Sequence, residues 1–366
     1  MKISPRSHQQ LSDEEAALAR VASLVESIKS LAPDELIDSK RSDVCRYIVD
    51  TANRYALGSL GAYFSLNQAI AYRALGKSDE AERSYQEALH RCPDKGWWYF
   101  EQGLFYKWKG KWQDAFDSFN QAARYLGDHK LITWNQGICA TSLGYAKHAQ
   151  KAWQSLGLKT CLRESGDWGV PDLDLANIRV PIVESKMQQW LPNSLSIDND
   201  PKQQHFEQLI VAPQSPCYGV VVSPSFHQEH VDYGDQVIWD HHPVSVRRRE
   251  DKLLPCFPIL SVVSKGEALS LPCLISDSQG MKSLFEEALG DMANLFVALQ
   301  KSQCLYGKIV VYQRSALPKL ALLIERFTQS HRHFRISIPR LHEFMGNTKQ
   351  AGIDHRLWQA LEPSSV

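Results

Sequence analysis

This 366-residue sequence lacks an excess of either positive or negative charge. It carries 41 Lys and Arg residues against 41 Asp and Glu residues, so its formal net charge is zero. A protein without a surplus of positive charge has no general attraction for phosphate backbones or for anionic lipid. We therefore expect neither nucleic acid nor a membrane among its partners.

Long apolar runs are missing as well. No segment approaches the ~20 consecutive apolar residues that cross a bilayer, and residues 1–10 lack the apolar core of a secretory signal. These absences predict a cytoplasmic protein. The eight cysteines are scattered without a C-x-x-C pair, so neither a zinc knuckle nor a disulfide framework is indicated.

The common enzyme signatures are also absent. The sequence contains no phosphate-binding glycine loop, no G-x-S-x-G elbow and no H-E-x-x-H pair. Because the length favours two domains, a catalytic domain could still accompany a binding one. The sequence therefore leaves the question of an enzyme open and favours a non-enzymatic role.

What the sequence does contain is a repeat with a period of 34 residues. Four features recur three times at this interval, namely a small residue, a glycine, an alanine and an aromatic residue: Ala69, Gly103 and Gly137; Gly76, Gly110 and Gly144; Ala81, Ala115 and Ala149; Tyr85, Phe119 and Trp153. This pattern predicts two antiparallel helices per unit. The small residue lets the two helices approach each other, and the glycine ends the first helix in a left-handed conformation. The alanine and the aromatic residue share one face of the second helix, at positions i and i+4.

These positions resemble the tetratricopeptide repeat, whose pattern is a small residue, glycine or alanine and an aromatic residue, followed by alanine, an aromatic residue and alanine. The resemblance covers residues 61–157. It weakens in the third unit, where Ala140 and Leu156 replace the expected aromatic residue and alanine. The resemblance implies an N-terminal, all-α superhelix.

Residues 1–60 are expected to supply helices that flank the first repeat. The segment that starts at Ser12 resembles a capping box, so Ser12 is predicted to cap a helix that ends near Leu31. A second helix is predicted over residues 42–57. Repeat stacks need their ends covered, and these two helices would cover one of them.

The resemblance also implies a concave groove lined by the first helix of each pair. Its lining would be rich in large apolar side chains, with two cations: Tyr63, Arg73, Trp97, Phe100, Leu104, Lys107, Trp108, Trp134 and Ile138. Buried aromatic residues contribute strongly at interfaces, so we expect the groove to bind another protein or a peptide. Two alternatives stay open. The groove could be filled by other parts of the same chain, or it could receive a segment of a second copy by self-association.

The second half of the sequence changes character. Gly, Pro and Asp residues punctuate residues 158–178 and predict a linker, and residues 179–366 predict an α+β domain without a family resemblance. Runs of β-branched residues predict strands at residues 179–183, 207–211, 218–222, 236–239, 258–263 and 269–275. An apolar stripe then predicts a helix over residues 281–301. Further along, strands are predicted at residues 307–312 and 334–338, and helices at residues 317–327 and 340–344. The predicted fold class is therefore multi-domain, with an all-α superhelix followed by an α+β domain.

Ligand-type side chains are densest between residues 227 and 242. Imidazole and carboxylate groups bind zinc, iron and manganese, so five residues are candidate ligands of a divalent metal: His227, His230, Asp232, Asp240 and His241. The spacing favours a solvated hairpin, because the zinc motif with two histidines on one face places them at i and i+4 of a helix. Our main hypothesis is a protein-interaction adaptor without a cofactor. The alternative is a metal-dependent enzyme with its site in this segment.

Overall fold

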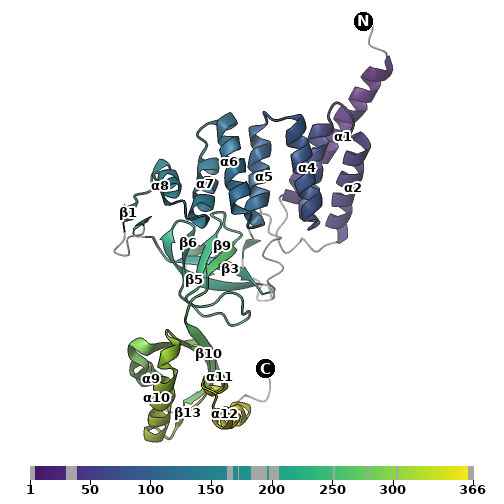
Figure 1. The fold of residues 1–366 in the computed structure, drawn as a ribbon. Coiled ribbons are helices and arrows are strands. Elements are labelled where there is room, and N and C mark those ends of the chain that lie inside the picture. The colour runs from purple at the N-terminus through teal and green to yellow at the C-terminus, as the bar shows by residue number, and fades with distance from the viewer. Residues whose placement is uncertain are drawn as a thin grey trace. The chain divides into compact units, whose positions relative to one another are not determined.

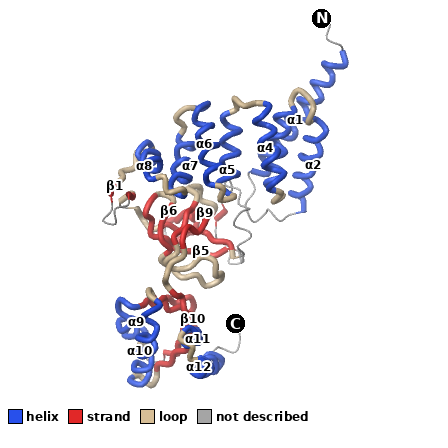
Figure 2. The backbone as a smooth tube through the Cα atoms, in the orientation of Figure 1, coloured by secondary structure: helices blue, strands red, loops and turns tan. Residues whose placement is uncertain are grey.

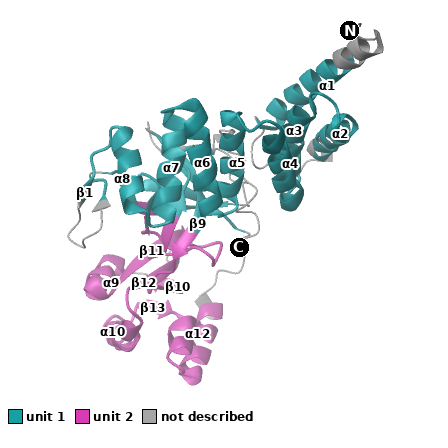
Figure 3. Cartoon of the chain, turned by 45° about the horizontal axis from the view of Figure 1, so that its top comes forward, with its two compact units in different colours: residues 1–208, 213–219, 238–261 teal, residues 209–212, 220–237, 262–366 magenta. Residues whose placement is uncertain are grey.

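The computed structural model describes residues 5–29, 39–162, 168–171, 173–182, 196–197, 206–249, 252–277, 280–301 and 304–361. The chain divides into two compact units (Figure 3). The first comprises residues 1–208, 213–219 and 238–261, and the second comprises residues 209–212, 220–237 and 262–366. Each unit has an apolar core of its own.

Helices follow one another through the first part of the first unit (Figure 1). Within the described residues they are α1 (Pro5–Lys29), α2 (Ser39–Tyr55), α3 (Gly61–Ala74), α4 (Ser78–Arg91), α5 (Gly96–Trp108), α6 (Trp112–Leu126), α7 (Lys130–Ser142) and α8 (Ala146–Ser155). The pairs α3 and α4, α5 and α6, and α7 and α8 pack against each other. The arrangement resembles a tetratricopeptide-type superhelix, as the sequence predicted.

The three glycines that follow the first helix of each pair have the predicted conformation. Gly76, Gly110 and Gly144 have φ angles of 73°, 68° and 70°. In the first pair, the N–H of Lys77 donates to the carbonyl oxygen of Tyr72 at 2.9 Å, which is the long hydrogen bond of a Schellman motif. Glycine reaches this left-handed region without strain, so each first helix ends at the expected place.

The seam of each helix pair is also packed as predicted. Ala81 and Tyr85 are completely buried, and so are their counterparts in the next two pairs. A Cβ atom added at Gly103 would lie 2.7 Å from the ring of Phe119. The small residues on the first helices are therefore required by rings that press against the helix backbone.

The flanking helices are present, but one of their predicted ends is wrong. Helix α1 begins at Pro5, so Ser12 lies inside the helix and does not cap it. Proline at the first helical position is pre-organised for a helix, and no glycine or proline interrupts residues 6–11. Helix α2 lies close to the predicted range.

Strands follow the helices along the chain (Figure 2). A two-stranded sheet joins β1 (Cys161–Leu162) and β2 (Trp168–Gly169). A seven-stranded sheet has the order β3 (Ala176–Pro181), β5 (Phe206–Ser215), β6 (Tyr218–Val221), β7 (Gln236–Trp239), β9 (Lys252–Ser264), β8 (Ser245–Arg249) and β4 (Ser196–Ile197). Strand β3 also pairs with β9, so five of these strands close into a ring.

The rest of the chain forms an α+β arrangement in the second unit. Its described elements are β10 (Leu269–Asp277), α9 (Lys282–Leu289), β11 (Ala293–Lys301), β12 (Cys304–Val311), α10 (Leu317–Ser330), β13 (Phe334–Ser337), α11 (Pro339–Phe344) and α12 (Thr348–Leu361). The four strands form a sheet of order β11-β12-β10-β13 with antiparallel pairing. From β10 to β13 the element order is that of the ferredoxin-like split βαβ motif.

The predicted helix over residues 281–301 is wrong. Helix α9 ends at Leu289, where Gly290 adopts a φ of 52°, and strand β11 begins at Ala293. Leu295 and Val297 pack on the core of the second unit, whereas the ring of Phe296, between them in sequence, lies 6.0 Å from that of Tyr233. The apolar residues after Gly290 therefore alternate with the period of a strand.

Candidate functional site

The predicted groove residues lie on helices α3, α5 and α7, whose shared surface we call the first-helix face. Tyr63, Trp97 and Leu131 occupy the same position in successive repeats, in the first turn of each helix. Their side chains are 37%, 46% and 38% exposed. Three large apolar side chains at one repeat position are thus accessible to a partner.

Another part of the first-helix face is filled by the chain itself. Lys107, Trp108 and Ile138 are only 1%, 5% and 0% exposed. Ile238 and Val244, which lie at β7 and just before β8, belong to the same buried core as Trp108 and Ile138. The residues between them, 239–243, include Asp240 and His241, the last two of the five candidate metal ligands.

A buried ion pair joins this segment to the first-helix face. The Nζ atom of Lys107 donates to Oδ2 of Asp240 and to Oδ1 of Asn135, each at 2.6 Å. Oδ1 of Asp240 lies 3.0 Å from Nδ1 of His241. Burial alone would raise the pKa of Asp240, but the charge of Lys107 and the close approach of His241 outweigh it and hold that pKa well below its usual range.

Trp134 is placed beside the same segment. Its ring centroid lies 4.8 Å from that of His241 and 5.3 Å from that of Trp153. His241 in turn lies against His242, with 4.4 Å between the ring centroids. The structure therefore brings Lys107, Trp134 and two of the residues considered as metal ligands into one cluster.

The remaining predicted groove residues lie around a second, smaller ion-pair group. Oε1 of Glu101 accepts from Nζ of Lys29 at 2.7 Å, and Oε2 of Glu101 lies 3.8 Å from Arg73. Phe100 and Leu104 are half-buried and pack against the core of the first unit. Helix α1 thus reaches the first-helix face through Lys29.

Several buried hydrogen-bond donors on this face have no acceptor among the described residues. They are Nε and one Nη of Arg73, Nε1 of Trp108 and Nε1 of Trp134. Buried polar groups are normally hydrogen-bonded, because leaving one without a partner costs ~1–3 kcal/mol. This face therefore carries more donors than the described residues can satisfy.

The other predicted metal ligands belong to a loop that is fixed by its own side chains. Oδ1 of Asp232 accepts the N–H groups of Ser225 and Tyr233 at 2.9 and 2.8 Å. His227 is exposed and His230 is half-buried. The carboxylate of Asp232 therefore holds the backbone of the loop.

Asp235 has a comparable role in the same loop. Its Oδ1 accepts the N–H of Gly266 at 2.9 Å, and its Oδ2 accepts the N–H of Asp232 and the Nζ of Lys265 at 2.9 Å. A Cβ atom at Gly266 would lie 2.5 Å from the carbonyl carbon of Gly234. The backbone segments around these two glycines can therefore approach each other because Gly266 has no side chain.

Across the described ranges, no three His, Cys, Asp or Glu side chains are grouped so as to hold a metal ion. Asp240 and His241 belong to the first unit, whereas His227, His230 and Asp232 belong to the second. The metal-dependent enzyme stays a hypothesis, which elemental analysis can test.

Sequence reasoning did not identify the partner of Lys107. Asp240 lies 133 residues further along the chain, and in the sequence it looks like one more ligand-type side chain before two histidines. In the sequence, Asn135 is one amide of the third repeat without a distinguishing neighbour. Nothing in the local pattern indicates that these residues meet, because their contact depends on how the strands pack on the helices.

Comparison with known proteins does not assign this chain to a family. No family model matches the chain, and no curated protein does. Among solved structures, MamA AMB-1 is 13% identical with a TM-score of 0.29, and the match covers 41% of this chain and 91% of that one. A MamA mutant is 14% identical with a TM-score of 0.29, covering 42% and 98%. In the described part of this chain, no helix combines the length and the apolar character needed to span a membrane.

Proposed function

We propose that this chain is a protein-interaction scaffold, and that its repeats hold a segment of a partner polypeptide on the first-helix face. The observation that carries this proposal is the exposure of Tyr63, Trp97 and Leu131 at one repeat position. A partner with apolar anchors would bury all three. Aromatic anchors buried at the centre of an interface contribute ~2 kcal/mol or more each.

The way in which the face holds the chain's own segment supports the proposal. Ile238 and Val244 are buried in the same core as Ile138, Asp240 pairs with Lys107, and His241 contacts Trp134. Apolar contacts together with a few directed polar contacts are also what binds a partner segment at an interface.

A photo-crosslinking experiment tests this proposal. Benzoylphenylalanine is placed at position 97 of the full chain, and at position 125 as a matched control. Tyr125 is an exposed aromatic residue of similar accessibility, 49% against 46%, but it lies on α6, the second helix of its pair. We expect a discrete cross-linked protein from position 97 and none from position 125.

The protein that is captured must then bind when purified. We expect Trp97→Ala to weaken its binding at least tenfold, whereas Tyr125→Ala leaves binding unchanged, because a hot-spot ring contributes more than 1.4 kcal/mol. A product of twice the mass of this chain would identify a second copy as the partner, and light scattering would confirm it. Equal effects of both substitutions would contradict the proposal.

A further inference from the structure

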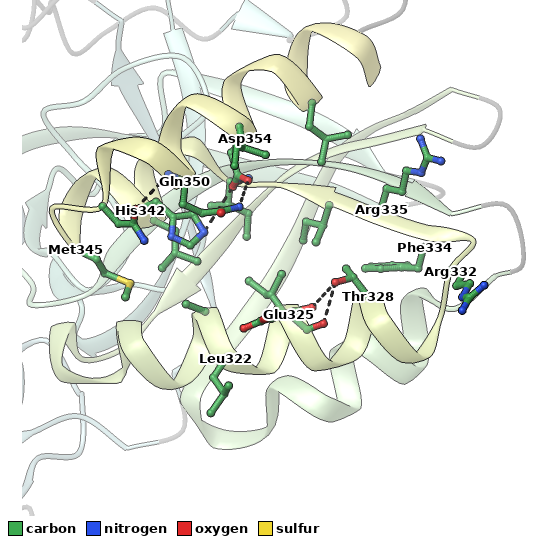
Figure 4. A pocket seen from close by; sticks show the side chains of 18 residues that line it. Leu322, Glu325, Thr328, Arg332, Phe334, Arg335, His342, Met345, Gln350 and Asp354 are labelled. Carbon is green, nitrogen blue, oxygen red and sulfur yellow. Dashed lines mark hydrogen bonds and ion pairs between the residues drawn. The ribbon is translucent and has the colours of Figure 1, made fainter.

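The second unit contains a cleft of about 670 Å³ that the proposed function does not use. Helices α10 and α12 supply side chains from its two sides, and β13, α11 and the residues that flank them contribute the rest (Figure 4). Volumes of ~300–1,000 Å³ are typical of sites that take small molecules. The cleft is therefore large enough for a ligand of that size.

Buried apolar side chains form the floor of the cleft, and exposed apolar side chains surround its opening. Ile336, Ile338 and Leu341 are 6%, 1% and 1% exposed, so the floor belongs to the core of the unit. Leu322 on α10, Met345 just after α11 and Ile353 on α12 are 46%, 39% and 40% exposed. Water therefore meets apolar carbon around the opening, and an apolar molecule that covers this rim would remove that contact.

Polar and charged side chains also line the cleft, and those at its two ends differ in charge (Figure 4). At one end, Nε2 of His342 lies 3.9 Å from Oδ2 of Asp354, and Nδ1 of His342 is buried without a partner among the described residues. At the other end lie Arg332 and Arg335, both exposed. Neither arginine is within ion-pair distance of a carboxylate in the part of the chain that the structure describes.

The two acidic side chains of the cleft already have partners. Oδ2 of Asp354 accepts the N–H of Ile338 at 3.2 Å, and Oε1 of Glu325 accepts from Nε2 of Gln329 at 3.2 Å. Their charges oppose an anion near the middle of the cleft and near the His342 end. The arginine end is left as the place where negative charge is favoured.

From these features we propose that the cleft binds an elongated apolar anion, such as a carboxylic acid with a chain of methylene groups. The tail lies over Leu322, Met345 and Ile353, and the carboxylate pairs with Arg332 and Arg335. Guanidinium groups suit this head group, because they bind carboxylates with two parallel hydrogen bonds.

Methyl NMR of the full chain with decanoate as the probe tests the proposal. The protein is labelled at its five methionine methyl groups, and Met345→Leu assigns the signal of the cleft. We expect a saturable shift of the Met345 signal. Met292, which packs against the core of the second unit and does not line the cleft, serves as an internal control and stays unchanged.

Two comparisons identify the role of the charge. Decyltrimethylammonium has the same tail and the opposite charge, and we expect it to bind at least tenfold more weakly than decanoate. Arg332→Gln with Arg335→Gln should weaken decanoate binding at least tenfold. Arg326→Gln, an exposed arginine of α10 outside the cleft, should leave it unchanged.

Three results would overturn the proposal. They are a Met345 signal that does not shift with decanoate, equal binding of the two probes, and an arginine double variant that binds decanoate like the unmodified protein. Equal affinity for decanoate and decyltrimethylammonium would indicate that the cleft binds apolar surface alone, such as that of a protein helix, regardless of the charge of the head group. The two arginines are exposed, so the variants are expected to fold, and circular dichroism verifies this.

Discussion

Nζ of Lys107 lies 2.6 Å from Oδ2 of Asp240, and the two side chains are only 1% and 2% exposed. Removing one partner of such a pair leaves a buried charge without compensation, which costs ~3–5 kcal/mol. We therefore expect Lys107→Met to lower the free energy of unfolding by about that amount, as measured by urea unfolding followed by tryptophan fluorescence. The double variant Lys107→Met with Asp240→Leu removes both charges and should recover most of the loss, because apolar pairs replace buried ion pairs at little cost.

The matched control for this prediction is Lys111→Met. Nζ of Lys111 lies 2.7 Å from Oε2 of Glu82, but the lysine side chain is 45% exposed. Exposed pairs contribute ~0–1 kcal/mol, so this variant should differ little from the unmodified protein. If Lys107→Met and Lys111→Met cost the same, the contact of Lys107 with Asp240 does not hold the segment on the helices.

The same pair predicts how stability depends on pH. The pKa of Asp240 is held below its usual range by Lys107 and His241 despite burial, whereas in the unfolded chain an aspartate titrates near ~3.9. The contribution of Asp240 is therefore fully present above about pH 5 and is lost as the pH falls, because the unfolded chain takes up a proton that the folded chain does not. Between pH 5 and pH 3 the stability of the unmodified protein should fall more steeply than that of the double variant. Parallel curves would contradict the depressed pKa.

Positions set by local rules could be predicted from the sequence. The 34-residue period identified the turn glycines, such as Gly76, and the buried pair Ala81 and Tyr85, because both follow from helix geometry within one repeat. The helix predicted over residues 281–301 failed after Leu289, because Phe296 on strand β11 continues the helical stripe of Leu284 and Leu289 by chance. Gly290 was the signal that could have ended that helix earlier.

The candidate site was harder to predict because it depends on packing between distant segments. The resemblance to a repeat family implied Lys107 and Trp134 as lining residues, but not that Asp240 and His241 would lie against them. The row formed by Tyr63, Trp97 and Leu131 was present in the sequence as one repeat position. Which of the lining residues stay accessible could be decided only from the burial of each side chain.

The third repeat offers a test of the small residue on the first helix. A Cβ atom at Gly137 would lie 2.7 Å from the ring of Trp153, which is completely buried. Gly137→Val should therefore lower the free energy of unfolding by ~1–3 kcal/mol or more, because the packed core cannot make room. Gly144→Asn is the control, since Gly144 has a φ of 70° with open space around it and asparagine tolerates this conformation. Equal losses in thermal and urea unfolding would mean that helix approach is not limited by this ring.

A substitution at Asp235 tests whether the carboxylates of its loop have a structural role or bind a metal ion. Asp235 is 3% exposed and accepts hydrogen bonds from Gly266, Asp232 and Lys265. In Asp235→Asn an amide N–H₂ replaces one acceptor oxygen and faces donors, so we expect a loss of ~1–3 kcal/mol in urea unfolding. Asp291→Asn, at an exposed position, should have no such effect.

Chelation completes this test, because a structural metal ion adds its binding free energy to stability. If the carboxylates of Asp232 and Asp235 serve the backbone of the loop, EDTA should leave the melting temperature of the unmodified protein unchanged. Elemental analysis of protein purified without a histidine tag should then find less than about a tenth of an equivalent of bound metal. Near one equivalent of zinc, iron or manganese, with a melting temperature that falls in EDTA, would instead favour the metal-dependent enzyme.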